Sequence, residues 1–414
     1  MDNIPTSPRL AEVRYEIRGA LARRARELEA AGRDIVHLNI GNPGRFGFRT
    51  PAPLVNAVAA HLEDSEGYCR EQGLEQARAA VVAQQTARGV TDIDSHRVFI
   101  GNGVSELIDT SLRALLAPGD EVLLPSPDYP LWSAATLLNG GQPRYYRCLA
   151  ANAHLPDPGE IESLITPRTR AIVLINPNNP TGAVYPHSLL ERLVDIAAHY
   201  GLLLLSDEIY DGITYDDARF QPLAPLAGAH PCLTFSGLSK VQRACGYRVG
   251  WMTLSGAPAA TASYRDALQL LAALRLCSNV PTQWAVAPAL QGTGDIDTLT
   301  ARGGRLHQAR QAVLSGVAAS EFLDIVAPRG ALYAFPSVSV TALPVFDDNA
   351  FALRLLEDES VLLAPGSSFN VAASRHLRLT LLPEPEVLAD VFTRIERTLT
   401  RMADAGARQH VATV

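Results

Sequence analysis

The chain has 414 residues, of which 47% are hydrophobic and 19% are charged, and its formal net charge is −7. This length and composition are typical of a soluble globular protein with a large core and two domains. Basic residues are scattered along an acidic chain, which argues against a protein that binds nucleic acid or a membrane surface. No apolar run approaches the ~18 residues needed to span a bilayer and no signal peptide is recognisable, so we expect a cytoplasmic protein.

The five cysteines are odd in number and widely spaced, with no Cys-x-x-Cys pair. This pattern predicts neither a disulfide framework nor a zinc site, and we expect no metal.

The first third of the chain is expected to be helical, with one long irregular segment. A helical period occupies residues 16–31, and further helical patterns occupy 52–63 and 73–88. Between the first two lies LNIGNPGRFGFRTPAP, which is too rich in Gly and Pro for regular structure. Such a segment is typical of backbone that approaches another group closely.

From about residue 97, short β-rich runs alternate with helical runs. RVFIG, EVLLP and AIVLIN each lead into a helical pattern, and LLLLS, CLTFS and RVGWMTL follow. Apolar strands separated by helices predict an α/β domain with a mainly parallel sheet that is covered on both faces. Ligands of such sheets bind beyond the carboxyl ends of the strands.

From about residue 300 the pattern changes to a smaller α+β domain. It comprises a long helix, the strand-like runs ALYAFPSV and RHLRLTLL, a helix near 348–358 and a final helix at 384–403, after which the last ten or so residues are expected to be disordered. We expect residues 49–300 to form the large domain, and residues 1–48 and 301–414 to form the small one.

Two turns after predicted strands carry candidate ligand groups. In GNGVSEL, Gly103 permits a tight turn, and the backbone N–H groups of Val104 and Ser105 begin a helix, which suits a phosphate. In NPNNPTG, Asn179 is placed to offer an amide to a ligand oxygen. The alternatives are an ordinary strand-to-helix turn and a plain Asn-Pro turn.

The strand LLLLS is followed by a carboxylate, Asp207, and by Tyr210. A carboxylate at a buried strand end needs a cationic partner, and a pyridinium N–H is one such partner. The alternative is that Asp207 caps a helix.

Lys240 is the only lysine among the 36 basic residues. Arginine replaces lysine where only charge is needed, but it cannot act as the neutral amine that attacks a carbonyl. Ser236, Ser239 and Arg248 lie near Lys240 in the sequence and suit a phosphate. The alternative is that Lys240 is one leftover cation in an Arg-rich composition.

Together these features predict one ligand with four groups: a phosphate, a ring nitrogen that pairs with a carboxylate, a phenolic oxygen and an aldehyde. Pyridoxal 5′-phosphate (PLP) has all four.

The chain resembles the fold-type I, PLP-dependent class I/II aminotransferases, and within them the bacterial glutamate–pyruvate (alanine) aminotransferases. The resemblance runs from about Tyr15 to Leu382 and rests on LNIGNP, GYCREQGLEQAR, IGNGVSEL, PSPDYPLW, NPNNPTGAVY, DEIYD, SGLSK, GYRVGW and PRGALY. It implies that residues 49–300 form the PLP-binding domain. It also implies a homodimer with shared active sites.

The resemblance implies roles at the cofactor. Lys240 would bind the aldehyde covalently and shuttle the proton, Asp207 would pair with the ring nitrogen, and Tyr129 would stack on the ring. Asn179 and Tyr210 would hold the phenolic oxygen. The phosphate would be held by Gly103, Val104, Ser105, Arg248, Ser236 or Ser239, and Tyr68 of the other subunit.

For the substrate, the resemblance implies Gly41, Asn42 and Asn179, with Arg378 taking the α-carboxylate bidentately. Arg18, Arg243 and Arg275 are candidates for a distal carboxylate, with a surface arginine as the alternative for each. Two positions depart from the family pattern. Gly237 stands where many relatives have a hydroxyl, and Arg243 stands where a small residue is common.

The resemblance therefore implies a PLP-dependent aminotransferase that moves an amino group between a small, alanine-like L-amino acid and a 2-oxo acid by a ping-pong mechanism. One alternative is another PLP reaction on the same scaffold, such as a β-lyase, decarboxylase or oxidase-type enzyme. A remote alternative is the effector-binding domain of a transcription regulator, which would require a DNA-binding segment ahead of this domain.

Overall fold

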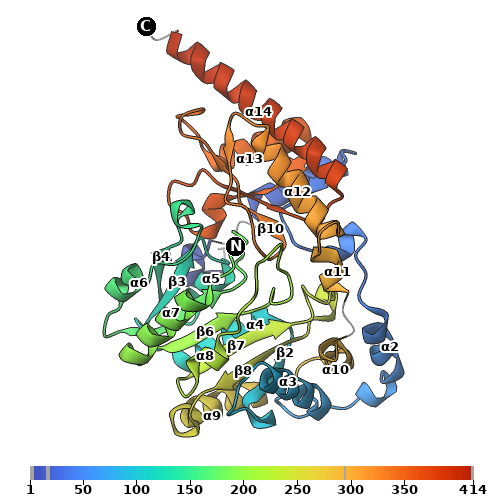
Figure 1. Ribbon diagram of the computed structural model, residues 1–414, viewed down its shortest axis with the longest axis vertical. Helices are drawn as coiled ribbons and strands as arrows, with labels where there is room; N and C mark the ends of the chain where they lie inside the picture. The colour runs from blue at the N-terminus through green and yellow to red at the C-terminus, as the bar shows by residue number, and fades with distance from the viewer. Residues whose placement is uncertain (1–3, 15–18, 293–294, 412–414) are drawn as a thin grey trace.

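The centre of the molecule is a seven-stranded sheet. The computed structural model describes residues 4–14, 19–292 and 295–411, with side chains described to residue 405 (Figure 1). The strand order is β2-β8-β7-β6-β5-β3-β4. Strand β8 is antiparallel to both of its neighbours, and the other adjacent strands are parallel. The strands are β2 (Val98–Gly101), β3 (Glu121–Ser126), β4 (Gln142–Arg147), β5 (Thr169–Ile175), β6 (Leu203–Asp207), β7 (Cys232–Gly237) and β8 (Gly250–Ser255).

Both faces of this sheet are buried, as the apolar strands predict. In β5, Ala171 and Val173 pack into the core on one face, while Ile172 and Leu174 pack into the core on the other. Alternate side chains of a strand point to opposite faces, so a fully apolar strand needs cover on both. One face is covered by α4 (Val104–Leu115), α5 (Leu131–Leu138) and α9 (Pro258–Leu274), and the other by α6 (Pro158–Leu164), α7 (His187–Tyr200) and α8 (Ala224–Ala227). The predicted α/β class and the mainly parallel, doubly covered sheet are confirmed.

A second core joins helices and short strands of the C-terminal part, which Figure 1 shows above the sheet. Its strands pair as β10-β14-β13 and as β11-β9. Its elements are α11 (Ile296–Thr300), α12 (Arg305–Ala318), β9 (Leu323–Asp324), β10 (Tyr333–Ala334), β11 (Ser337–Val338), α13 (Asp348–Glu359), β12 (Val361–Leu362), β13 (Ala364–Pro365), β14 (Leu377–Thr380) and α14 (Pro385–Val411).

Helix α14 is amphipathic because its buried apolar residues recur every three or four positions. Leu388, Val391, Ile395 and Leu399 are all buried in the second core. The helix continues to Val411, past its expected end near residue 403, so the tail that we expected to be disordered is helical as far as it is described.

The N-terminal segment reaches both parts of the molecule. It contains α1 (Ala20–Ala30), β1 (Val36–His37), α2 (Ala52–Ala60) and α3 (Glu75–Ala87), and α10 (Val286–Leu290) packs against α2 and α3. Because β1 pairs with β12, we propose to keep residues 1–48 with 301–414 as the small domain. Within the described ranges, no helix combines the length and apolarity that a membrane crossing requires.

Candidate active site

Three loops meet where β8 begins. Gly250 of β8 pairs with Gly101 of β2 on one side and with Gly237 of β7 on the other. A Cβ atom at Gly250 would lie 2.6 Å from the backbone nitrogen of Val104, so only glycine fits at this crossing. The loops after β2 and β7, and the residues before β8, are therefore held at one edge of the sheet.

The start of α4 forms an anion-binding site at this edge. Gly103 has φ of 85°, and α4 begins at the next residue. The first N–H groups of a helix have no intrahelical acceptor, so those of Val104 and the exposed Ser105 are available to a ligand. The guanidinium of Arg248 lies so close to Gly103 that a Cβ atom there would collide with it, and it donates to the carbonyl of Asn102 at 3.2 Å. A helix terminus and an exposed arginine thus meet at a residue without a side chain.

Asp207 is the buried carboxylate at the end of β6. The indole N–H of Trp132 donates to Asp207 Oδ2 at 3.1 Å, and the backbone N–H of Ile209 donates to Oδ1 at 3.3 Å. Burial raises the pKa of Asp207 to about 6, although both hydrogen bonds and the positive charge of Lys240 oppose that rise. A carboxyl group in this environment favours a cationic N–H partner.

Lys240 lies in the loop after β7 and faces the N-terminal segment. Its Nζ donates to the carbonyl of Gly41 at 2.8 Å. Nearby, the hydroxyl of Tyr210 donates to the hydroxyl of Tyr333 at 3.2 Å. Burial raises the pKa of Tyr210 well above the usual phenol value, so Tyr210 is a hydrogen-bond donor at neutral pH.

Arg378 is a buried cation that belongs to β14. Its Nη1 donates to Asn179 Oδ1 at 3.1 Å, and its Nη2 donates to the carbonyl of Asn39. The guanidinium carbon lies 4.4 Å from the ring centroid of Tyr333 and 4.7 Å from that of Phe369. Among the described residues, Nε of Arg378 has no hydrogen-bond partner. A buried guanidinium held in this way is suited to an incoming carboxylate.

The other predicted residues differ in exposure. Ser236 is buried at the end of β7, whereas Ser239 is half-buried beside Lys240. Tyr129 packs against the cluster that contains Phe369. Asn42 accepts a hydrogen bond from the thiol of Cys245 at 3.5 Å.

Tyr68 stands apart from these residues because its side chain is 81% exposed. Arg18 lies outside the described residues.

Two of the three arginines predicted for a distal carboxylate are bonded within the protein. Arg243 is buried, donates to the carbonyl of Arg49 at 2.9 Å and pairs with Asp295. Arg275 pairs with Glu106 at 2.7 Å. In this structure both side chains are used to join segments of the chain.

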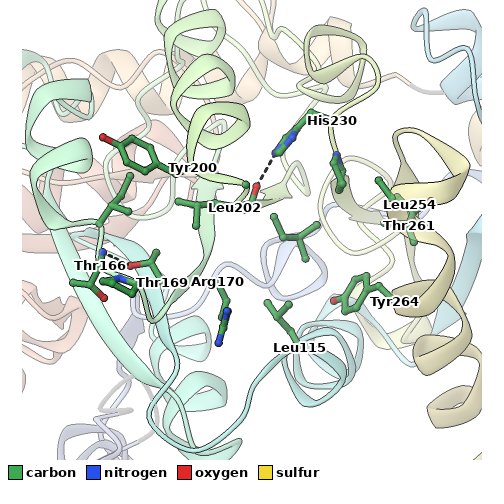
Figure 2. A pocket seen from close by; sticks show the side chains of 16 residues that line it. Leu115, Thr166, Thr169, Arg170, Tyr200, Leu202, His230, Leu254, Thr261 and Tyr264 are labelled. Carbon is green, nitrogen blue, oxygen red and sulfur yellow. Dashed lines mark hydrogen bonds between the residues drawn. The ribbon is translucent and has the colours of Figure 1, made fainter.

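A cavity of about 780 Å³ lies at the opposite edge of the sheet, where β5, β6 and β7 begin (Figure 2). Its polar side chains bond to the protein: His230 to the carbonyl of Leu202 at 2.7 Å, and Tyr264 to the carbonyl of Ser111 at 2.8 Å. The polar groups of this cavity are thus used by the protein itself, whereas Asp207, Lys240 and the start of α4 lie at the other edge.

The sequence predicted no role for three residues of this site: Trp132, Tyr333 and Phe369. Trp132 and Tyr333 belong to the motifs PSPDYPLW and PRGALY, so the motif pattern contained a signal for these two. Phe369 lies in no such motif, and its contact with Arg378 depends on the packing of the C-terminal part.

Comparison with known proteins gives a consistent result. The sequence model of the family "Aminotransferase class I and II" matches residues 33–395. The chain is 42% identical over 400 residues to the glutamate–pyruvate aminotransferase AlaA of Escherichia coli K12, covering 97% of this chain and 99% of that protein. It is 45% identical over 390 residues to an alanine aminotransferase of Mycobacterium tuberculosis H37Rv, covering 94% and 91%.

Solved structures are also similar. A crystal structure of an aminotransferase from Escherichia coli superposes with a TM-score of 0.94 at 42% identity, covering 96% of this chain and 99% of that one. An alanine aminotransferase from Pyrococcus furiosus gives a TM-score of 0.91 at 33% identity, covering 96% and 100%.

Proposed function

The chain belongs to the class I and II aminotransferases, and we propose that it exchanges an amino group between alanine and 2-oxoglutarate, yielding pyruvate and glutamate. It is thus an enzyme of the fold-type I aminotransferase group. The substrate proposal rests on relatives, at 42% and 45% identity, that are named glutamate–pyruvate and alanine aminotransferases. Alanine would lose its amino group and become pyruvate, and 2-oxoglutarate would gain that group and become glutamate, so atoms balance over the whole reaction.

We propose PLP as the cofactor because the donor set fits each of its groups. The start of α4 beside Gly103 and Arg248 suits a phosphate, and buried Asp207 suits a protonated ring nitrogen. When bound, PLP supplies an electron-withdrawing ring that stabilises negative charge on the substrate's α-carbon. The residues proposed to hold it are Lys240, Asp207, Tyr129, Asn179, Tyr210, Gly103, Val104, Ser105, Arg248, either Ser236 or Ser239, and Tyr68 of a second subunit.

In this proposal, the protein's residues divide the work. Arg378 binds the α-carboxylate of the substrate, with Gly41, Asn42 and Asn179 beside it. Lys240, as a free amine, would take the α-proton of the substrate and hold it for its return. Asp207 would hold a proton on the ring nitrogen of bound PLP, which would make removal of the α-proton easier.

We further propose that the enzyme is a cytoplasmic homodimer. The side chain of Tyr68 is exposed, which suits a contact with a second subunit. All five cysteines are free thiols, which is in keeping with a reducing compartment.

The observation that carries the proposal is that Lys240, the sole lysine, lies at the strand-end edge that also holds Asp207. Loading the purified enzyme with PLP and adding alanine alone tests it. We expect one equivalent of pyruvate and no ammonia from the wild type, and no pyruvate from Lys240→Ala or Lys240→Arg, because arginine keeps the charge but not the amine.

A matched control is Arg113→Ala, which removes an exposed cation whose contact is a surface pair with Asp109. It should behave as the wild type does. Pyruvate from Lys240→Ala at the wild-type rate would refute the role of this lysine. Ammonia release by the wild type, with uptake of oxygen as the electron acceptor, would indicate an oxidase-type reaction instead.

A further inference from the structure

The segment Pro328–Tyr333 joins the two loops that carry Asn179 and Tyr210. The backbone N–H groups of Arg329 and Gly330 both donate to the carbonyl of Gly182 at 2.8 Å, and the N–H of Ala331 donates to the carbonyl of Ile213 at 3.0 Å. Gly182 follows Asn179 in its turn, and Ile213 follows Tyr210. One segment is therefore bonded to both loops.

These three pieces of chain are packed without spare room. A Cβ atom at Gly330 would lie 2.8 Å from the carbonyl oxygen of Ile213 and 2.8 Å from Cβ of Pro177. At Gly182, where φ is 73°, a Cβ atom would collide with Pro328. Close packing of this kind fixes where the chain enters β10, and so where Tyr333 lies.

The ring of Tyr333 contacts Arg378 because of the strand register. Tyr333 of β10 pairs with Thr380 of β14, and Arg378 lies two residues before Thr380 on the same face. The guanidinium is thus enclosed between two aromatic rings, that of Tyr333 and that of Phe369. An arginine enclosed in this way loses little further freedom when it binds a carboxylate.

The hydroxyl of Tyr333 contacts Tyr210 and the backbone of Gly41. It accepts the hydrogen bond from Tyr210, and it is so close to Gly41 that a Cβ atom there would collide with it. The carbonyl of Gly41 accepts the hydrogen bond from Lys240. Burial alone would raise the pKa of Tyr333, but the positive charges of Lys240 and Arg378, with hydrogen bonds from Tyr210 and Gly41, lower it below the usual phenol value.

We infer that Tyr333 is a positioning residue that sets the distance between the carboxylate-binding arginine and the reacting amine. Its ring holds Arg378, and its hydroxyl holds Tyr210 and the backbone of Gly41, whose carbonyl accepts the hydrogen bond from Lys240. This inference rests on the proposed function, to which it adds a residue that touches neither reacting atom. The two halves of the side chain have separate tasks, so they can be tested separately.

The test uses the PLP-loaded enzyme and three variants: Tyr333→Phe, Tyr333→Leu and, as matched control, Tyr215→Phe. Tyr215 is also buried and donates to the carbonyl of Ala331 at 3.0 Å, in the same segment. Calorimetry gives the Kd for glutarate, which has both carboxylates of 2-oxoglutarate but no reactive carbonyl. Steady-state kinetics gives kcat and KM for alanine.

We expect Tyr333→Leu to weaken glutarate binding by about tenfold or more, because Arg378 loses one ring. We expect Tyr333→Phe to leave the glutarate Kd and the alanine KM within about threefold while kcat falls by about tenfold, because only the hydroxyl is lost. Tyr215→Phe should change none of the three.

Wild-type glutarate affinity in Tyr333→Leu, or wild-type kcat in Tyr333→Phe, would overturn the inference. If Tyr333→Leu does not fold, Tyr333→Met removes the ring with a flexible side chain and tests the same point. A wild type that makes no pyruvate from alanine would instead refute the proposed function, while the glutarate measurement would still report on Tyr333 and Arg378.

Discussion

Arginine has a different role at each of three positions in this molecule: 248, 378 and 243. Arg248 is exposed beside the start of α4, where its charge adds to that of the helix terminus. Arg378 is buried between aromatic rings. Arg243 is buried as well, but it is bonded to main-chain carbonyls and to Asp295. Sequence position alone does not distinguish these cases, because each depends on which partners surround the guanidinium.

The contacts of Arg243 predict a structural effect when it is replaced. Arg243→Ala should lower the free energy of unfolding by about 2 kcal/mol, because the carbonyls of Arg49 and Val241 lose their charged donor. It should leave the KM for 2-oxoglutarate within about twofold. Denaturant unfolding and steady-state kinetics measure the two effects. Unchanged stability together with a raised KM would instead assign Arg243 to the distal carboxylate.

The position of a site residue could be predicted from the sequence where that residue lies at or just after the end of a recognisable strand. Asp207 is the last residue of one buried strand, and Lys240 follows another, so their place at the sheet edge could be inferred from strand order. Tyr333 could not be assigned a role in this way. Its contact with Arg378 depends on the register of β10 against β14, and neither strand has a sequence pattern long enough to specify register.

At the scale of elements, two histidines lie where the loop after β4 meets the C-terminal part of the chain. His376, just before β14, stacks on Phe335 with ring centroids 4.6 Å apart, and the ring centroid of His154 lies 6.1 Å from that of Phe335. Burial, together with the charge of His154, lowers the pKa of His376 to about 4 from its usual 6.5. Burial lowers the pKa of His154 as well.

From these lowered pKa values we predict that acid destabilises the contact between the loop after β4 and the C-terminal part. Between pH 6.5 and 4 the unfolded chain binds a proton at His376 that the folded protein does not. The contribution of His376 to the free energy of unfolding therefore falls as the pH falls, by up to about 3 kcal/mol. In His376→Phe this contribution should be absent, which denaturant unfolding at pH 7 and pH 4.5 can measure.

The comparison between variant and wild type is needed because other groups act in the opposite sense. Burial raises the pKa of Asp128 to about 6 and that of Glu208 to about 7, and both groups favour the folded state as the pH falls. They are common to both proteins and cancel in the difference. An equal loss of stability in the two proteins on acidification would contradict the role of His376.

The elements themselves were predictable where a period extends over several turns or a strand is fully apolar. Six strands of the main sheet and the long helices have such patterns, whereas the edge strand β4, with the sequence QPRYYR, is mostly polar and was not predicted. Strands β10 and β11 lie within the predicted strand-like run ALYAFPSV, whereas β9, β12 and β13 have two residues each, which is too short for a period to be recognised. Their pairing follows from the packing of α12, α13 and α14 around them.

At the scale of the whole molecule, four exposed hydrophobic side chains lie on two neighbouring segments. Leu270 and Leu274 of α9, with Leu276 just after it, are 62%, 74% and 56% exposed, and Tyr68 is 81% exposed. Gln269 of α9 bonds to Glu71 at 3.0 Å, so the two segments are neighbours. A surface of this kind suits a second copy of the chain.

Mixed dimers test whether Tyr68 acts across the subunit boundary. Tyr68→Ala should lower PLP affinity by about tenfold, and Lys240→Ala should abolish turnover. If subunits of the two variants are exchanged at equal amounts, half of the dimers are hybrids with one complete site, so about a quarter of the wild-type activity should return at limiting PLP. Recovery of no activity in verified hybrids would show that Tyr68 does not act in the other subunit's site.

The sole lysine of the molecule has a consequence for how the site can be observed. Because every other residue of the Lys and Arg set is arginine, a reagent that modifies primary amines has one side-chain target, the nitrogen that bonds to the Gly41 carbonyl, besides the α-amino terminus of the chain. The mass gained by the peptide that contains Lys240 therefore counts reacted sites directly, with no background from surface lysines. One chemical label thus reports on the proposed reactive group.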